Sequence, residues 1–220
     1  MSVQIPGGGV TLEGDLNVPG DLHGVVLFAH GSGSSRHSPR NRYVAKVLQD
    51  AGMATLLLDL LTETEESLDR ETDRLRFDID LLATRLLHAT AWLVQQPMIR
   101  EVKLGYFGAS TGAAAALVAA SEAAQDAGVV VSRGGRPDLA GPALGGVRAP
   151  TLLIVGGEDP VVLNLNRDAM AQLQCEKRLE IVPGATHLFE EPGTLEEVAR
   201  LAREWFEGHL GRRSEKIRVA

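Results

Sequence analysis

An apolar strand that leads directly into a glycine-flanked serine, and then into an alanine-rich helix, constrains this chain most. Residues 102–112 read Val-Lys-Leu-Gly-Tyr-Phe-Gly-Ala-Ser-Thr-Gly, and a run of alanines follows. The pattern G-x-S-x-G between a strand and a helix is typical of a nucleophile elbow, a sharp turn that exposes one serine hydroxyl. The sequence therefore predicts Ser110 as a nucleophile. It also raises the question whether a histidine and a carboxylate accompany it.

Strands alternate with helices along most of the chain. Strands are expected at 10–18 near an N-terminal hairpin and at 24–29, 53–58, 102–107, 129–132, 151–155 and 178–182. Helical spacing of apolar residues predicts helices at 39–51, from Leu75 to a point before Pro97, at 111–124, at 161–174 and from Thr194, where Thr194 and Glu197 suggest a capping box. Such alternation predicts a mostly parallel sheet with helices on both faces, a three-layer α/β fold.

The length of 220 residues suits one domain with a sizeable core. We expect a single α/β domain over residues 1–210 and a basic C-terminal tail over residues 211–220. Residues 59–80 carry many more acidic than basic side chains. That segment is open to two interpretations, a mobile flap over the site or a solvated helical approach, and the charge pattern favours the second.

Composition excludes several kinds of partner. The formal net charge is −7, and no basic stripe is present, so nucleic acid is not an expected partner. No apolar run approaches the roughly 20 residues that a membrane-spanning helix needs. The N-terminus does not resemble a signal peptide, and the one cysteine, Cys175, cannot form an intrachain disulfide, which together favour the cytoplasm. No spaced ligand cluster predicts a metal, and we expect no cofactor.

A carboxylate candidate follows the strand expected at 151–155. Asp159 lies in the segment Gly-Gly-Glu-Asp-Pro, where its carboxylate can orient a histidine and stabilise the imidazolium that forms during turnover. An Asp-Pro turn without any catalytic role is the alternative, and Glu158 competes for the acid role. We favour Asp159 because its place relative to the strand fits the pattern of an acid that follows an elbow serine in the chain.

A histidine candidate follows the last expected strand. His187 can accept the proton of Ser110 and return it to the leaving group, because the ordinary pKa of histidine lies near neutrality. The other five histidines fit less well: His88 and His209 lie in helices, His23 is at the wrong edge of the sheet, and His30 and His37 precede the elbow. The side chain of His30 is better suited to bracing its loop. The chain order Ser, Asp, His therefore selects His187.

Two backbone amides are expected to form an oxyanion hole. One belongs to Thr111, the residue after the nucleophile, and the other to the loop after the first buried strand. That loop reads His30-Gly31-Ser32-Gly33, from which we assign Ser32 as the donor, with Gly33 as the second choice. A flexible loop without a role is the alternative.

These four segments in this order resemble the α/β-hydrolase superfamily, and the compact size resembles dienelactone hydrolase-like proteins and small bacterial carboxylesterases. The resemblance covers essentially the whole chain. It implies an α/β-hydrolase fold, a mostly parallel sheet with helices on both faces, and a Ser-His-Asp triad of Ser110, His187 and Asp159. Dienelactone hydrolases proper carry a cysteine nucleophile, and Ser110 stands at that place here. Many relatives insert a helical cap, for which only residues 133–150 are available, so a minimal cap or none is expected.

The chemistry predicted by these residues is hydrolysis of a small-molecule ester or thioester through an acyl-enzyme on Ser110. An acyltransferase with the same triad and a non-catalytic hydrolase-fold binding protein are the alternatives. Arg36 and His37 follow the oxyanion loop and are candidate substrate-binding residues for an anionic acyl group, as are Arg133 and Arg136 at the same edge; exposed solvated arginines are the alternative. A monomer or a homodimer is expected.

Overall fold

Eight strands form one sheet in the computed structural model of the protein, which describes residues 1–99, 101–123 and 126–210. The strand order is β1-β2-β4-β3-β5-β6-β7-β8. The strands are β1 (Ser2–Pro6), β2 (Thr11–Asn17), β3 (Gly24–Ala29), β4 (Met53–Leu58), β5 (Leu104–Ala109), β6 (Ala127–Arg133), β7 (Thr151–Gly156) and β8 (Lys177–Val182).

The six strands from β4 to β8 in this order are parallel, and the N-terminal hairpin of β1 and β2 extends the sheet in antiparallel fashion. The strands β3, β4, β5 and β7 are buried along their whole length. Continuous apolar sequence suits such strands, because helices cover both faces of a parallel sheet. The carboxyl ends of the parallel strands therefore meet at one edge, which is where loops can assemble a site.

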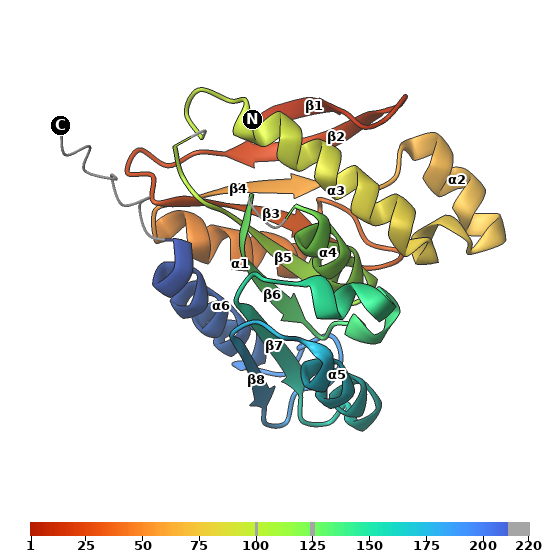
Figure 1. The fold of residues 1–220 in the computed structure, drawn as a ribbon, viewed down its shortest axis with the longest axis vertical. Helices are drawn as coiled ribbons and strands as arrows, with labels where there is room; N and C mark the ends of the chain where they lie inside the picture. Colours follow the sequence, from red (N-terminus) through yellow and green to blue (C-terminus); the bar gives the residue numbers. More distant parts are fainter. Residues whose placement is uncertain (100, 124–125, 211–220) are drawn as a thin grey trace.

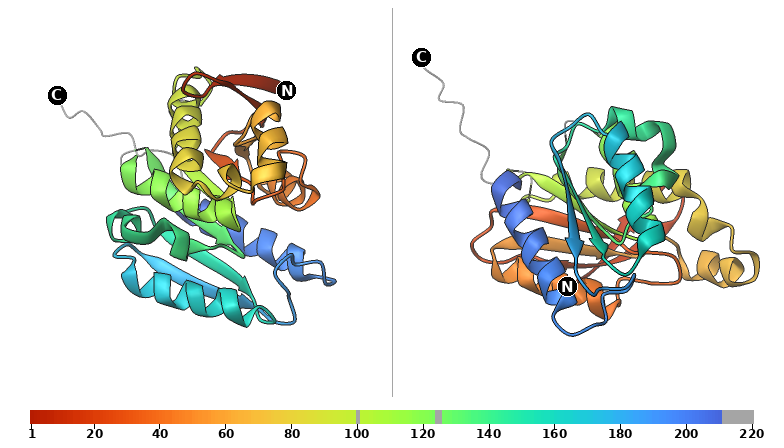
Figure 2. Two further views of the ribbon diagram at one scale, coloured as in Figure 1. Left: turned by 90° about the vertical axis from the view of Figure 1, so that its right-hand side faces the viewer. Right: turned by 90° about the horizontal axis from the view of Figure 1, so that it is seen from below.

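Helices cover the two faces of the sheet unequally (Figures 1 and 2). On one face lie α3 (Ile79–Val94), α4 (Thr111–Glu122) and α5 (Pro160–Gln172), and on the other lie α1 (Pro39–Asp50) and α6 (Thr194–Leu210). The helix α2 (Glu63–Thr72) projects from the end of the molecule near α3. Two 3₁₀ segments, η1 (Leu75–Phe77) and η2 (Pro137–Gly146), complete the described elements.

Each face of the sheet has its own apolar core. The larger core packs the leucines of α3 and the alanines of α4 against the sheet, and the smaller core packs α1 and α6 against its other face. Ten successive residues of α4, from Thr111 to Ala120, are buried. A helix this enclosed has to consist of small side chains, which explains its run of alanines. The helix that follows Ser110 is thereby enclosed by the core.

The expected three-layer α/β fold is confirmed, and the differences are local. The long helix expected from Leu75 begins instead at Ile79, because the Asp78 side chain accepts a hydrogen bond from Leu81 N (3.0 Å) and caps the helix there. The acidic segment before it forms α2, with a capping box of Thr62 and Glu65. The capping box expected at Thr194 is absent: its hydroxyl donates to Glu191 O (2.7 Å).

The segment between β6 and β7 is where a cap domain would be inserted. The chain forms only the 3₁₀ segment η2 there, so the described residues hold no helical cap domain, as expected. No helix within the described ranges has both the length and the apolar character to cross a membrane. The basic tail expected at 211–220 lies outside the described residues.

Candidate active site

The turn at Ser110 has the strained backbone of an elbow. Ser110 follows β5 with φ 51° and ψ −122°, a left-handed conformation that side-chain-bearing residues seldom adopt. Its amide donates to Arg133 O (3.2 Å), and its carbonyl accepts from Arg136 N (3.1 Å), so the turn is fixed by the segment after β6. A Cβ on Gly112 would lie 2.4 Å from the carbonyl oxygens of Ala29 and His30, so only glycine fits there. Strain that is held in this way is characteristic of functional sites.

The carboxylate of Asp159 is fixed by the start of a helix. Asp159 caps α5, and its Oδ1 accepts from Val162 N (3.3 Å), while Pro160 occupies the first helical position. Its other oxygen, Oδ2, lies 2.8 Å from His187 Nδ1. The neighbouring Glu158 is exposed, and its amide donates to Ala185 O (2.9 Å). The structure thus pairs His187 with Asp159, the carboxylate that the sequence favoured over Glu158.

The loop that carries His187 passes very close to the end of β7. A Cβ on Gly156 would lie 2.3 Å from Ala185 O and 2.7 Å from Thr186 O, so glycine alone permits this approach. Because a carboxylate only accepts hydrogen bonds, His187 donates through Nδ1, which leaves Nε2 of the neutral ring as an acceptor. The side chain of His187 is 39% exposed and that of Asp159 15%. The ring is therefore held on its inner side and open on its outer side.

Ser110 and His187 both lie against the segment that follows β6. Arg133 O accepts the hydrogen bond from Ser110 N, and a Cβ on Gly134 would lie 3.1 Å from His187 O and 3.6 Å from His187 Cε1. No hydrogen bond joins the Ser110 hydroxyl to His187 among the described residues. Such a bond often forms fully only when substrate is in place.

The loop after β3 lies over the elbow. Ser32 N donates to Thr111 Oγ1 (2.9 Å), and a Cβ on Gly31 would lie 3.0 Å from Ser110 Cβ. His30 braces this loop from below, as expected from the sequence: Leu60 N donates to His30 Nε2 (3.1 Å), and His30 Nδ1 donates to Gly31 O (2.9 Å). Burial lowers the pKa of His30 against the opposing effect of the Gly31 bond, so the ring is neutral.

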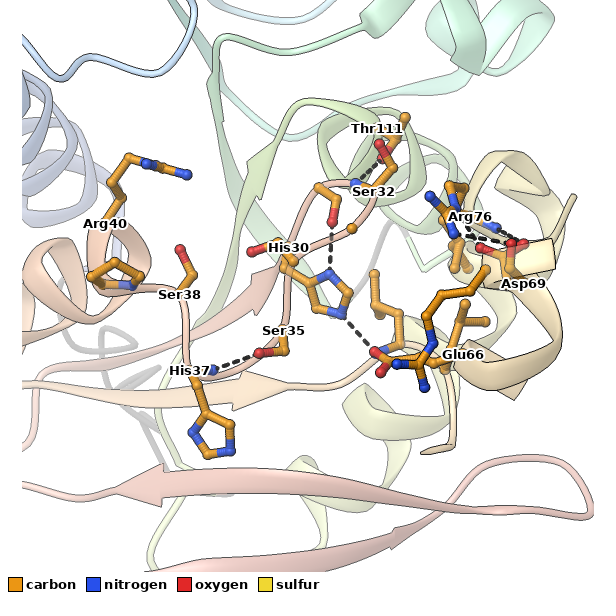
Figure 3. A pocket seen from close by; sticks show the side chains of 18 residues that line it. His30, Ser32, Ser35, His37, Ser38, Arg40, Glu66, Asp69, Arg76 and Thr111 are labelled. Carbon is orange, nitrogen blue, oxygen red and sulfur yellow. Dashed lines mark hydrogen bonds and ion pairs between the residues drawn. The ribbon is translucent and has the colours of Figure 1, made fainter. Parts of the chain in front are cut away.

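A cavity of about 560 Å³ opens beside this loop (Figure 3). It is bounded by the loop from His30 to Arg40, by α2 and by Thr111, and its apolar wall consists of Leu60, Leu61 and Leu82. Gly31 and Thr111, which line the cavity, are also the neighbours of Ser110. The cavity therefore lies next to the elbow and extends toward α2, although Ser110, Asp159 and His187 are not among its lining residues.

The wall of the cavity formed by α2 carries charged groups. Arg76 Nε donates to the buried carboxylate of Asp69 (2.5 Å), and the two appear on one side of the cavity in Figure 3, away from Arg40. Glu66 lines the same wall. Burial, together with the negative charge of Asp59, raises the pKa of Glu66 above its ordinary value. This end of the cavity is therefore polar, and the charges of Arg76 and Asp69 compensate each other.

The two candidate substrate-binding residues after the oxyanion loop are placed differently. Arg36 is committed to Asp59: its amide donates to Oδ1 (2.6 Å) and its guanidinium pairs with Oδ2. His37 lines the cavity, is exposed, and its Nδ1 lies 3.3 Å from Arg42 Nη2. Arg36 therefore contributes to the framework of the loop in this structure, whereas His37 is accessible.

The burial of Arg133, a candidate substrate-binding residue, was not predicted from the sequence. It could be placed only at the sheet edge, whereas the structure buries its side chain to 8% exposure with no hydrogen-bond partner for Nε or Nη1 among the described residues. Its neighbour Arg136 is paired with Asp138 (2.7 Å). The one signal available in the sequence was a basic residue at the end of an otherwise apolar strand.

Comparisons with known proteins agree with this architecture. The dienelactone hydrolase family model matches residues 15–207. A solved dienelactone hydrolase from Anabaena variabilis is 61% identical with a TM-score of 0.93, over 96% of this chain and 97% of that chain. Est1E from Butyrivibrio proteoclasticus shares the fold, with a TM-score of 0.79 at 15% identity over 94% of this chain and 98% of that chain.

Two curated relatives from Mycobacterium tuberculosis strains are longer. Each is 60% identical over 208 residues, which is 94% of this chain but 46% of the relative, and each is provisionally named a phosphoribosyl transferase. The chain thus spans about half the length of the curated relatives it matches. The family match, the closely similar fold and the strained elbow with its neighbouring acid–histidine pair lead to one conclusion: this chain belongs to the dienelactone hydrolase family and has the α/β-hydrolase fold.

Proposed function

We propose that the chain is a serine hydrolase that cleaves carboxylic esters or thioesters through an acyl-enzyme on Ser110. The observation that carries the proposal is that a strained, glycine-flanked Ser110 and a hydrogen-bonded Asp159–His187 pair lie against the same segment after β6. A histidine whose Nδ1 is held by a carboxylate presents Nε2 as a base. Membership of a hydrolase family supports the same chemistry.

In the first half of the reaction, His187 Nε2 takes the proton of the Ser110 hydroxyl as the serine oxygen attacks the substrate carbonyl. His187 then returns the proton to the leaving alcohol or thiol, and an acyl-enzyme remains. In the second half, His187 activates a water that releases the acid. Asp159 keeps the ring in the required tautomer and stabilises its protonated form.

The oxyanion is assigned to the amides of Thr111 and Ser32. Thr111 begins α4, so its amide belongs to the positive end of a helix, where negative charge is favoured. The Ser32 amide points at Thr111 Oγ1 in the present structure. For Ser32 to donate to an oxyanion, the Thr111 side chain has to rotate or share this hydrogen. The hydroxyl of Thr111 therefore holds the loop in place until substrate arrives.

The cavity beside the elbow suits a small-molecule substrate. Its volume of about 560 Å³ falls in the range of ordinary ligand pockets. The leucines Leu60, Leu61 and Leu82 offer an apolar wall for part of the substrate.

A fluorophosphonate probe tests the proposal, because it labels a serine only where a base activates it. We expect labelling of the wild-type protein and none of Ser110→Ala. A panel of p-nitrophenyl esters and acyl-thioesters of increasing chain length then measures the acyl preference. Absent labelling, or undiminished labelling of Ser110→Ala with folding intact, would overturn the proposal. Product analysis with added alcohols or amines separates hydrolysis from acyl transfer, and ligand binding without turnover would favour a binding protein.

The transferase name of the longer relatives is not carried over to this chain. The chain matches a solved dienelactone hydrolase over 97% of that protein but spans only 46% of these relatives. We assign the transferase activity to the part of the relatives that this chain does not match. Formation of a ribose-phosphate product by this chain would contradict that assignment.

A further inference from the structure

Asn166 is a polar residue on the buried face of α5, the helix beside β7 and η2 in Figure 1. The buried residues of this helix are Val162, Asn166 and Ala169, and the side chain of Asn166 is 0% exposed. Its Nδ2 donates to Val162 O (2.8 Å), one turn earlier in the helix, and to Gly135 O (3.0 Å), in the segment after β6. Both acceptors are carbonyl oxygens, so the amide nitrogen has to point at them. The bond to Gly135 O connects α5 to another part of the site.

The segment that Asn166 reaches, residues 133–136, holds the turn at Ser110. Its first residue accepts a hydrogen bond from the Ser110 amide, and its last residue donates one to the Ser110 carbonyl. Gly135 lies between these two anchors, and a Cβ there would lie 2.0 Å from a buried serine hydroxyl, so only glycine fits. The neighbouring Gly134 lies against His187. A shift of Gly135 would therefore move the elbow relative to the histidine.

The helix that carries Asn166 also holds the proposed acid of the triad. Asp159 caps α5, and seven residues, close to two full turns, separate it from Asn166, so the two lie on nearly the same side of the helix. Val162 links them, because its amide donates to Asp159 Oδ1 (3.3 Å) and its carbonyl accepts from Asn166 Nδ2. Asp159 Oδ2 in turn lies 2.8 Å from His187 Nδ1. One asparagine side chain thus joins the helix of the acid–histidine pair to the segment that holds the elbow.

The surroundings of Asn166 favour a role beyond filling space. Its Oδ1 is buried without a hydrogen-bond partner among the described residues, and an unpaired buried polar atom is unfavourable. A leucine of similar volume would avoid this cost, and the neighbouring buried positions of the helix, Val162 and Ala169, are apolar. The two hydrogens of Nδ2 therefore explain the residue better than its volume does.

We propose that Asn166 is a positioning residue, which holds the Ser110 elbow at the distance from the Asp159–His187 pair that proton transfer requires. It touches no reacting atom and acts through Gly135. The inference rests on the proposed function, because it concerns the alignment of the proposed nucleophile with its base. A displacement of about 1 Å in a reacting group can slow a reaction by roughly 100-fold. Loss of the bond to Gly135 O should therefore slow the chemistry of Ser110 while the fold and the acid–histidine pair persist.

The kinetics of labelling by a small fluorophosphonate test this role, because they separate the rate at which Ser110 reacts from the fraction of protein that is able to react. We expect Asn166→Leu to be labelled at least tenfold more slowly than wild type, but to the same final extent. Asn166→Ser can still donate to Val162 O within the helix but is too short to reach Gly135 O, so it should be as slow as Asn166→Leu. Asn166→Gln retains the amide and should recover part of the rate.

Two variants of the same helix are the matched controls, and both should be labelled at the wild-type rate. Asn164→Ala removes an exposed asparagine whose Oδ1 accepts only from Arg167 (3.3 Å) among the described residues. Ala169→Gly destabilises the buried face of α5 without removing the bond to Gly135 O. The pH profile of the labelling rate supplies a second measurement. Its midpoint reports the base, so Asn166→Leu should keep the wild-type midpoint and lower only the plateau.

Failure of the two proposals looks different. An unchanged labelling rate in Asn166→Leu, with or without a smaller labelled fraction, overturns the positioning role and leaves the serine hydrolase intact. Equal slowing by Ala169→Gly overturns it too, because the stability of α5 would then govern the rate. If Asn166→Leu does not fold in a thermal melt, Asn166→Ser provides the same comparison. Absence of labelling in wild type overturns the serine hydrolase and the positioning role together.

Discussion

Arg85 and Arg133 are buried to nearly the same extent, at 5% and 8% exposure, but they differ in the partners that surround their guanidinium groups. Arg85 lies in α3 near the β1–β2 hairpin, where Nη2 pairs with Glu65 (2.8 Å) and Nη1 donates to Gly7 O. This cation links three segments of the scaffold through partners that the chain itself supplies. Arg133 has no such partner among the described residues, although it ends β6, an interior strand of the sheet.

The difference extends beyond the two arginines. At the carboxyl edge, polar atoms of Arg36, Arg40, Ser132, Arg133 and Asn166 are buried without hydrogen-bond partners among the described residues, and Nε of Arg85 and Nε of Arg203 are further examples elsewhere. Buried polar groups normally pair within the protein, so exceptions require an explanation. Arg85 has a carboxylate and a carbonyl as partners for its two terminal nitrogens, whereas no group among the described residues pairs with Arg133. This contrast yields four predictions, in order of decreasing effect.

The largest effect is expected from Asp159→Asn. Asparagine also caps helices well, so α5 and the fold should persist. The histidine loses the carboxylate that sets its tautomer and stabilises its charge, and kcat should fall by roughly 10³- to 10⁴-fold. Steady-state ester hydrolysis measures the loss. Glu158→Gln, one residue away and exposed, is the matched control and should retain activity; equal losses in both variants would show that the acid is wrongly assigned.

The oxyanion assignment is tested by Ser32→Pro. Proline removes the amide hydrogen that now points at Thr111 Oγ1, and loss of one oxyanion donor costs about 10²- to 10³-fold in kcat. Ser32→Ala keeps the amide and should lose much less than the proline variant. If the proline variant cleaves esters as well as the alanine variant does, the donor is a different residue, with Gly33 the next to test.

The third prediction compares the two arginines directly, through urea unfolding. Arg85→Leu leaves Glu65 and Gly7 O without their partner and should lower the free energy of unfolding by about 2–3 kcal/mol, because Glu65 is partly exposed. Arg133→Leu removes a cation that has no partner and should be neutral or stabilising. A larger loss at Arg133 than at Arg85 would mean that Arg133 serves the fold, and the contrast would fail.

The smallest effect is the pH dependence from His30. Burial keeps this ring neutral in the folded state, whereas in the unfolded chain it takes up a proton near pH 6.5. Below that pH the unfolded state therefore binds more protons, and stability falls as the pH drops from 7 toward 5, by at most about 1.4 kcal/mol per pH unit. Unfolding of His30→Asn across this range should show a shallower slope than wild type. Parallel slopes would contradict a neutral, buried His30.

Much of the fold was predictable from local sequence. The buried strands β3 and β4 were predicted with their observed boundaries, because continuous apolar runs between glycines and polar turns mark them clearly. The start of α1 at Pro39 follows from Ser38 as its cap. Helix boundaries were less certain where two signals competed, as at Leu75, where apolar spacing suggested an earlier start than the cap at Asp78 allows.

The candidate site was predictable in part, for a related reason. Ser110, Asp159 and His187 each lie in the segment that follows a strand, and a parallel sheet brings such segments to one edge. The contact between Asp159 and His187 agrees with that reasoning, while the catalytic roles of the three residues stay predictions until the variants are measured. The role of Arg36 as a substrate ligand was suggested by its position in the sequence, but its pairing with Asp59 depends on β4, which is distant along the chain.

The sequence by itself determined the order of strands and helices and the identity of the elbow. The spacing of apolar residues, the helix caps and the glycines are local signals, because each involves only a few neighbouring residues. Only the tertiary structure decided which charges are paired. Nothing in the sequence distinguishes Arg85 from Arg133 in this respect. Arg85 has hydrogen-bond partners that are 20 and 78 residues away along the chain, Glu65 and Gly7. Nε and Nη1 of Arg133 have no partner among the described residues. Pairing depends on distance in space, which a parallel sheet with long crossovers separates from distance along the chain.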